Sequence, residues 1–147
     1  EFATERSQHL MSLGIPLNTD STLKGQTVFL AERCGELMYD DIITDRTILD
    51  VMAFTLNAKS IPHQDKDAFE VYASEFIREY DYIFYISPHG IEIEDNGIRE
   101  TDEHYRDLID FTITTLIKRH GHKAGKIEKI SGSTEERIQQ ILNITSL

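Results

Sequence analysis

The run Tyr-Ile-Phe-Tyr-Ile at residues 82–86 constrains the fold of this chain more than any other feature. A nearly continuous apolar run is typical of a strand that is covered on both faces, as in a parallel sheet. Apolar residues recur at helical spacing on either side of it, at 69–77 and 105–116. Strands that alternate with helices predict a layered α/β domain with a parallel sheet and right-handed crossovers. The 147 residues fit a single domain, residues 1–147.

The stretch Asp40–Asp50, DDIITDRTILD, carries the first candidate site. Residues 42–44 are β-branched and predict a short buried strand, and Thr47 can cap a helix that begins at Ile48. Asp45 and Arg46 then lie at the C-terminal tip of that strand, where open α/β sheets bind ligands. The pattern leaves a second interpretation open, in which Asp45 and Arg46 simply form an ion pair with each other.

The remaining elements follow from similar signals. We expect a helix that is capped by Ser21 and runs to about Met38. Three polar residues of this helix lie off its apolar stripe and predict a solvated face: Gln26, Glu32 and Arg33. Residues 126–130 read as a last strand. A capping box formed by Ser133 and Glu136 predicts the final helix.

Two further groups suit a phosphate-bearing ligand. Arg99 and Arg106 are seven residues apart, and a helix that extends back to Arg99 would carry both on one face. Paired guanidinium groups suit a phosphate chain, although each could instead pair with a nearby carboxylate of Glu100, Asp102 or Asp110. The turn at Ser131 and Gly132 feeds a helix N-terminus and can border a nucleotide base. It is also the ordinary way in which an αβα layer closes.

Composition narrows the class of partner. The net charge of −11 argues against a broad nucleic-acid surface, and no apolar run approaches the ~20 residues of a membrane span. The single Cys34 excludes an internal disulfide framework and fits a reducing compartment. We therefore expect a cytoplasmic protein with small-molecule partners and no membrane association.

The order of these parts resembles the small P-loop nucleoside and nucleotide kinases, and especially ATP-binding proteins related to the nicotinamide riboside kinase domain. The matching stretches are FATERSQHL with GIPLN, QTVFLAERCGEL, TDRTILDVMAF, YDYIFYISP, DNGIRETDEHYRDLI and ISGSTEERIQQIL. They span nearly the whole chain in the right order. The resemblance implies a P-loop NTPase-like, three-layer αβα fold with a parallel sheet.

The same resemblance implies ATP-dependent phosphoryl transfer to a nucleoside, nucleotide or similar small acceptor, with ATP and Mg²⁺ as cofactors. Asp45 would handle Mg²⁺ or the acceptor hydroxyl, and Arg46 would hold the acceptor. The other implied site residues are the lid arginines Arg99 and Arg106, the acceptor contacts Glu5 and Arg6, and Ser131 and Gly132 beside the adenine.

One departure from the resembled pattern is large. Such proteins begin with a strand and a Gly-x-x-x-x-Gly-Lys-Ser/Thr loop, and these 147 residues contain no such motif. We expect the first, central strand and its P-loop to lie in a segment of ~25–40 residues before Glu1, or to come from another chain. Two alternatives stay open: a non-catalytic nucleotide-responsive or structural module, and an acidic interaction domain. The sequence leaves the acceptor and the oligomeric state open.

Overall fold

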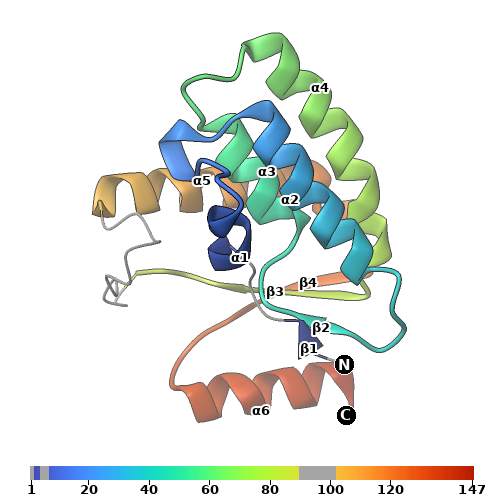
Figure 1. The fold of residues 1–147 in the computed structure, drawn as a ribbon. Coiled ribbons are helices and arrows are strands. Elements are labelled where there is room, and N and C mark those ends of the chain that lie inside the picture. The colour runs from blue at the N-terminus through green and yellow to red at the C-terminus, as the bar shows by residue number, and fades with distance from the viewer. Residues whose placement is uncertain (1, 4–6, 90–101) are drawn as a thin grey trace.

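The computed structural model describes residues 2–3, 7–89 and 102–147, and these form a mixed α/β arrangement. Figure 1 shows helices α1–α5 on one side of the strands and helix α6 on the other. The strands are β1 (Phe2–Ala3), β2 (Ile43–Thr44), β3 (Tyr82–Ile86) and β4 (Lys126–Ile130). The α-helices are α1 (Ser7–Ser12), α2 (Leu23–Glu36), α3 (Ile48–Leu56), α4 (His63–Ser74), α5 (Glu103–His120) and α6 (Thr134–Thr145). Short 3-10 helices cover Asn18–Asp20, Glu75–Glu79 and Gly121–Lys123.

The strands form two separate parallel pairs in the described part of the chain. β1 pairs with β2, with Phe2 opposite Ile43, and β3 pairs with β4 from Tyr82 opposite Lys126 to Ile86 opposite Ile130. The predicted α/β class and the parallel pairing are therefore confirmed. In the described residues the two pairs are not hydrogen-bonded to each other, and β2 and β3 are separate.

Local capping signals set the helix starts. Thr47 and Asp50 form a capping box at the start of α3, and Ser133 and Glu136 form the predicted one at the start of α6. The start predicted for α2 is wrong by one residue, because Thr22 Oγ1 rather than Ser21 accepts the backbone N–H of Gly25, at 3.1 Å. Asp102 caps α5 by accepting the N–H of His104 at 2.9 Å.

The hydrophobic core lies between the helices and one face of the β3–β4 pair. Its fully buried members come mainly from α3, α4 and α5, and include Ile48, Met52, Ala53, Ala73, Ile77 and Leu116. Helix α6, on the opposite face, has no fully buried residue. Across the described residues, none of the helices is long and apolar enough to cross a membrane.

Three burial predictions are wrong. The strand before Asp45 is open rather than buried, since Ile43 is 64% exposed. The strand at 82–86 is not covered on both faces, because its two end residues, Tyr82 and Ile86, are each 41% exposed. Gln26 and Arg33, expected on a solvated face, are buried, and only Glu32 among the three is partly exposed.

Candidate functional site

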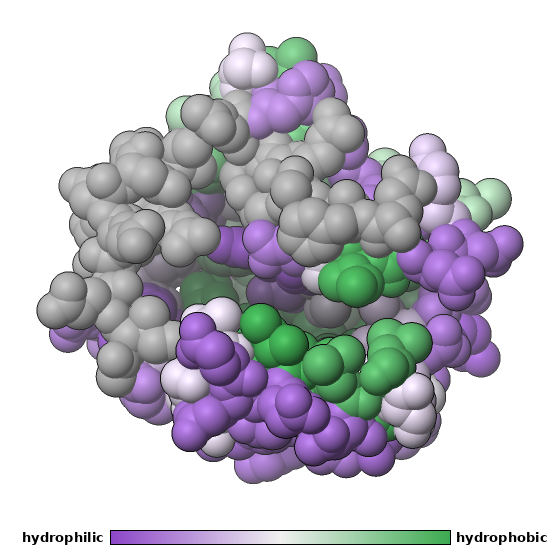
Figure 2. All heavy atoms as spheres, turned by 90° about the horizontal axis from the view of Figure 1, so that it is seen from below, coloured by the Kyte–Doolittle hydropathy of each residue, from purple (hydrophilic) through white to green (hydrophobic). Residues whose placement is uncertain are grey.

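A cleft of about 1880 Å³ separates β2 from β3. Residues 42–44 line it from one side and all five residues of β3 line it from the other, while β4 contributes Ile130. Helices α3 and α5 form one wall, and Ile141 and Thr145 of α6 lie on the opposite wall. Seen from below, Figure 2 shows hydrophobic side chains gathered near the middle of this face with hydrophilic side chains around them.

The chain leaves β2 through a tightly held turn at Asp45 and Arg46. Arg46 adopts the left-handed conformation (φ 77°), and its carbonyl accepts the hydroxyl of Thr44 at 2.9 Å. The buried Arg33 of α2 donates from Nη1 to the carbonyl of Asp45 at 2.9 Å. The same Nη1 atom lies 3.0 Å from Glu36 Oε2. Arg33 thus holds the turn through the backbone carbonyl of Asp45, a contact that does not involve the side chains of Asp45 and Arg46.

The two predicted side chains at this turn have different surroundings. Asp45 is exposed and lines the cleft. The guanidinium of Arg46 lies over the ring of Phe54, with Cζ 5.7 Å from the ring centroid, a cation–π contact. In the part of the chain that the structure describes, Asp45 and Arg46 form no ion pair with each other, so the geometry does not support the interpretation that they only pair mutually.

The backbone N–H groups at the N-terminus of α3 already donate hydrogen bonds within the protein. The N–H of Thr47 donates to Asp50 Oδ2 at 2.8 Å, and the N–H of Leu49 donates to Thr47 Oγ1 at 3.1 Å. The N–H of Ile48 donates to the hydroxyl of Tyr80 at 3.2 Å, and burial raises the pKa of that phenol. An anion at this end of the cleft would therefore meet arginine side chains rather than backbone N–H groups.

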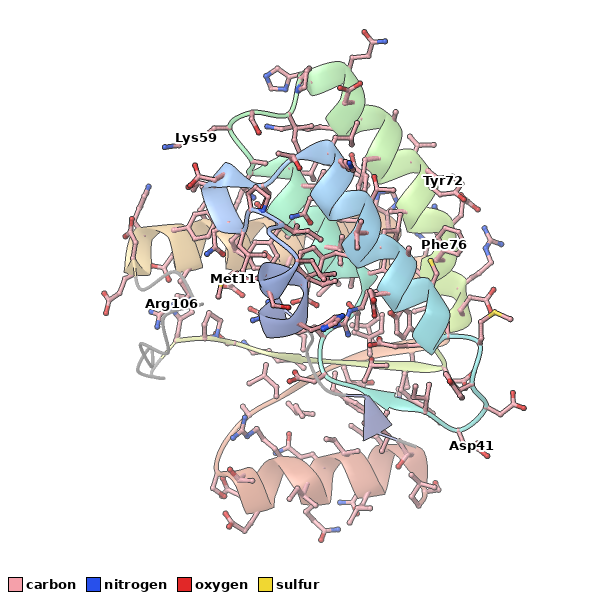
Figure 3. The ribbon with its side chains drawn as sticks, in the orientation of Figure 1. Met11, Asp41, Lys59, Tyr72, Phe76 and Arg106 are labelled. Atoms are coloured by element: carbon pink, nitrogen blue, oxygen red, sulfur yellow. The ribbon has the colours of Figure 1, made fainter. Side chains whose placement is uncertain are left out.

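Helix α5 contributes the other polar wall. Arg106 is partly buried and lines the cleft, and its Nε lies 3.6 Å from Asp107 Oδ1. Figure 3 shows Arg106 beside the C-terminal end of β3. One turn further along α5, Asp110 Oδ1 accepts the hydroxyl of Tyr85 at 2.5 Å. Burial and then this carboxylate raise the pKa of Tyr85 to about 12, so Tyr85 is a neutral hydrogen-bond donor.

The structure brings together three of the residues predicted from sequence: Asp45, Arg46 and Arg106 line the same cleft. Ser131 and Gly132 are exposed and do not line it. Ser131 instead exchanges two hydrogen bonds with the side chain of Gln140, at 3.2 and 2.7 Å, and Gly132 has a φ of 100°. Glu5, Arg6 and Arg99 lie outside the described residues.

Sequence reasoning missed Arg33, Tyr85 and Asp110. Asp110 stands four residues after Arg106, so helical spacing could have placed both on one face. Tyr85 was counted as part of an apolar run, although its hydroxyl needs a partner when buried. Helical spacing could have paired Arg33 with Glu36, three residues on, but not with the backbone carbonyls it also reaches, which are twelve and thirteen residues away.

No group of three or more His, Cys, Asp or Glu side chains is placed to hold a metal ion within the ranges that the structure describes. Mg²⁺ commonly uses one or two carboxylates together with substrate phosphates, and Asp45 fits that smaller requirement. Comparison with models of protein families, with curated proteins and with solved structures found no match for this chain.

Proposed function

We propose that this chain is the acceptor-binding part of a P-loop NTPase-like kinase that transfers a phosphoryl group from ATP to a nucleoside, nucleotide or similar small acceptor. The observation that carries the proposal is the meeting of Asp45, Arg46 and Arg106 in one cleft at the carboxyl ends of β2 and β3. Open α/β sheets bind their ligands at this edge. The single Cys34 fits a reducing compartment and supports a cytoplasmic setting.

The two arginines would bind the phosphate of the acceptor. A guanidinium stays charged and can bridge two phosphate oxygens. The two arginines enter the cleft from separate elements, Arg46 from the β2–α3 turn and Arg106 from the start of α5. The left-handed backbone of Arg46 and the face of Phe54 restrict where its guanidinium can lie. Two cations held from opposite sides can also stabilise charge on a phosphoryl group during transfer.

Asp45 would hold Mg²⁺ with the phosphates or accept the proton of the acceptor hydroxyl. Its exposed carboxylate can reach ligand in the cleft while its backbone is fixed through Arg33. Mg²⁺, when bound, neutralises phosphate charge. The backbone cradle for the ATP phosphates would come from outside residues 1–147, and Ser131 and Gly132 would border the adenine.

Calorimetric titration with AMP, CMP and ATP, each with and without Mg²⁺, tests the proposal. We expect a nucleotide to bind, and Arg46→Asn and Arg106→Gln each to weaken it about 10- to 100-fold, the scale of losing a hydrogen bond to a charged group. Asn is chosen at position 46 because it tolerates the left-handed conformation. Asp45→Asn should reduce the effect of Mg²⁺ on ATP affinity.

Arg78→Ala is the matched control, because Arg78 is exposed and pairs with Glu75 outside the cleft. Its nucleotide affinity should equal that of the unmodified chain. If no nucleotide binds, or if the three arginine variants behave alike, the cleft is not a phosphate site.

A second candidate function is a structural interaction module. The observation that favours it is the pair of open strand edges beside the cleft, which can bind polypeptide without any nucleotide. Peptide binding combined with failure to bind any nucleotide would favour this function over the first.

A further inference from the structure

One carboxylate on the wall of the cleft has a hydrogen-bond partner on only one of its two oxygens. Asp110 of α5 lines the cleft, and its side chain is only 15% exposed. Its Oδ1 atom accepts the hydroxyl of Tyr85 at 2.5 Å. Within the described ranges Oδ2 accepts no hydrogen bond, and its contact with Nε2 of His89, at 3.9 Å, is too long for one. A partly buried carboxylate is stabilised by donors on both oxygens, so Oδ2 is suited to accept a donor from a ligand.

Tyr85 fixes the direction of this carboxylate. The hydrogen bond joins strand β3 to helix α5, and both residues line the cleft. Burial and the neighbouring carboxylate raise the pKa of Tyr85 to about 12, so the phenol keeps its proton. Because a phenol has a single proton and Tyr85 donates it to Oδ1, the group left for a ligand is the acceptor Oδ2.

Asp110 lies one helical turn beyond Arg106. The two residues are four positions apart on α5, which places them on the same face and about 6 Å apart along the helix axis, at ~1.5 Å per residue. Both line the cleft, and Arg46 enters it from the β2–α3 turn. A ligand whose phosphate lies at the arginines can therefore place the carbon atoms next to that phosphate beside Asp110. One sugar ring can bridge this span.

The charges on this wall select the kind of donor. A carboxylate only accepts hydrogen bonds, so the ligand group opposite Oδ2 has to donate. An ammonium group would donate, but its positive charge would lie near Arg46 and Arg106. A hydroxyl group donates without a charge, and two neighbouring hydroxyls can donate to one carboxylate because each of its oxygens has two lone-pair sites. The wall therefore favours a phosphate-bearing ligand with neighbouring hydroxyl groups.

We propose that Asp110 is a specificity-determining residue that selects ribosyl phosphates over 2-deoxyribosyl phosphates, by accepting hydrogen bonds from the 2- and 3-hydroxyls of the sugar. Tyr85 is the positioning residue that holds the carboxylate toward the cleft. This selection rests on the proposed function for its phosphate contacts and narrows the acceptor to a ribosyl phosphate. Since Asp110 contacts only the sugar, the preference does not need a base.

Two sugar phosphates without a base test the proposal on the 147-residue chain. Calorimetric titration gives the affinities for ribose 5-phosphate and 2-deoxyribose 5-phosphate. We expect ribose 5-phosphate to bind about tenfold more tightly, the scale of one hydrogen bond to a charged group. In Arg106→Gln both ligands should bind more weakly by a similar factor, because both carry the phosphate. This comparison of two ligands needs no variant of Asp110 and does not depend on whether such a variant folds.

Asp110→Asn separates recognition from a structural role. The amide has the same shape and still offers an oxygen to Tyr85, but it has no charge. The preference for ribose 5-phosphate should fall to about threefold, because a charge-assisted hydrogen bond is roughly twice as strong as a neutral one. The affinity for 2-deoxyribose 5-phosphate should stay the same or rise, since a negative charge near the phosphate is removed. A purely structural Asp110 would instead lower both affinities alike.

Tyr85→Phe tests the positioning residue. The carboxylate is then free to turn away from the sugar, so the preference should fall to about threefold while the affinity for 2-deoxyribose 5-phosphate stays unchanged. Tyr72→Phe and Asp67→Asn are the matched controls, because both residues are exposed on α4 and neither lines the cleft. Both controls should keep the tenfold preference.

The outcomes that overturn the selection differ from those that overturn the proposed function. Equal affinity for the two sugar phosphates, with both weakened in Arg106→Gln, would remove Asp110 as a specificity residue and leave the phosphate site in place. Binding of AMP without binding of either sugar phosphate would show that the base is required and would also overturn it. If neither nucleotides nor sugar phosphates bind, the proposed function itself fails and the selection fails with it.

Discussion

The two faces of the strand layer differ in how well they are covered. On one face, α3, α4 and α5 bury side chains completely, including Met52, Ala73 and Leu116. On the other face α6 has a strong amphipathic pattern and yet no fully buried residue, and Ile138 and Leu142 stay exposed. The same chain thus contains a closed core and an open cleft. The difference indicates that most of the stabilising burial lies in the helical layer and that the side of α6 contributes less.

The largest expected effect is the difference in stability loss between a buried apolar residue on the helical face and an exposed apolar residue on the α6 face. Met52→Ala, at a side chain with 0% exposure, should lower the free energy of unfolding by about 2–5 kcal/mol, because it leaves a cavity among close-packed groups. Leu142→Ala, at 38% exposure on α6, should cost roughly 0.5–1 kcal/mol. Urea unfolding of both variants measures the two values. Similar losses would mean that α6 is as firmly packed as the helical layer.

A smaller effect is expected at the link between the helical layer and the open strand β2. Arg33→Ala removes a buried guanidinium that bonds Glu36 and the Asp45 carbonyl, and should cost about 2 kcal/mol. Arg78→Ala removes an exposed pair with Glu75 and should cost about 0–1 kcal/mol. Thermal or urea unfolding separates the two. Equal costs would show that burial of Arg33 does not strengthen its contacts.

The smallest effect concerns Tyr85 at the edge of the cleft. Its pKa is raised to about 12 by burial and by Asp110, above the ordinary value of 10.0. The neutral phenol is therefore favoured by folding, and its contribution to stability is present below pH 10 and is lost as pH rises toward 12. Asp110→Asn should lower the pKa of Tyr85 toward its ordinary value. Ultraviolet titration, with Tyr85→Phe to assign the signal, measures this; an unchanged titration would remove Asp110 as a cause.

The sequence by itself determined the local elements. Capping boxes at Thr47 and Ser133 act over three residues, and the apolar run at 82–86 needs no distant partner to favour an extended strand. Such short-range interactions survive in any tertiary context, so the α/β class and the positions of α3, β3, β4 and α6 could be predicted. The position of Asp45 and Arg46 directly after a strand followed from the same signals.

Only the tertiary structure decided which side chains are buried and which distant side chains contact one another. Arg33 and Glu32 are neighbours on one helix, but only Arg33 reaches the carbonyls at the end of β2 and is buried there. Ile43 belongs to a β-branched strand and is nevertheless 64% exposed, because the burial of a strand side chain depends on what packs over its face. Arg46 and Arg106, sixty positions apart in the numbering, share a cleft because the crossover helices return the chain to the same edge. Which side chains are buried, and which distant side chains come into contact, depends on how all the helices and strands pack together, and no local sequence pattern encodes it.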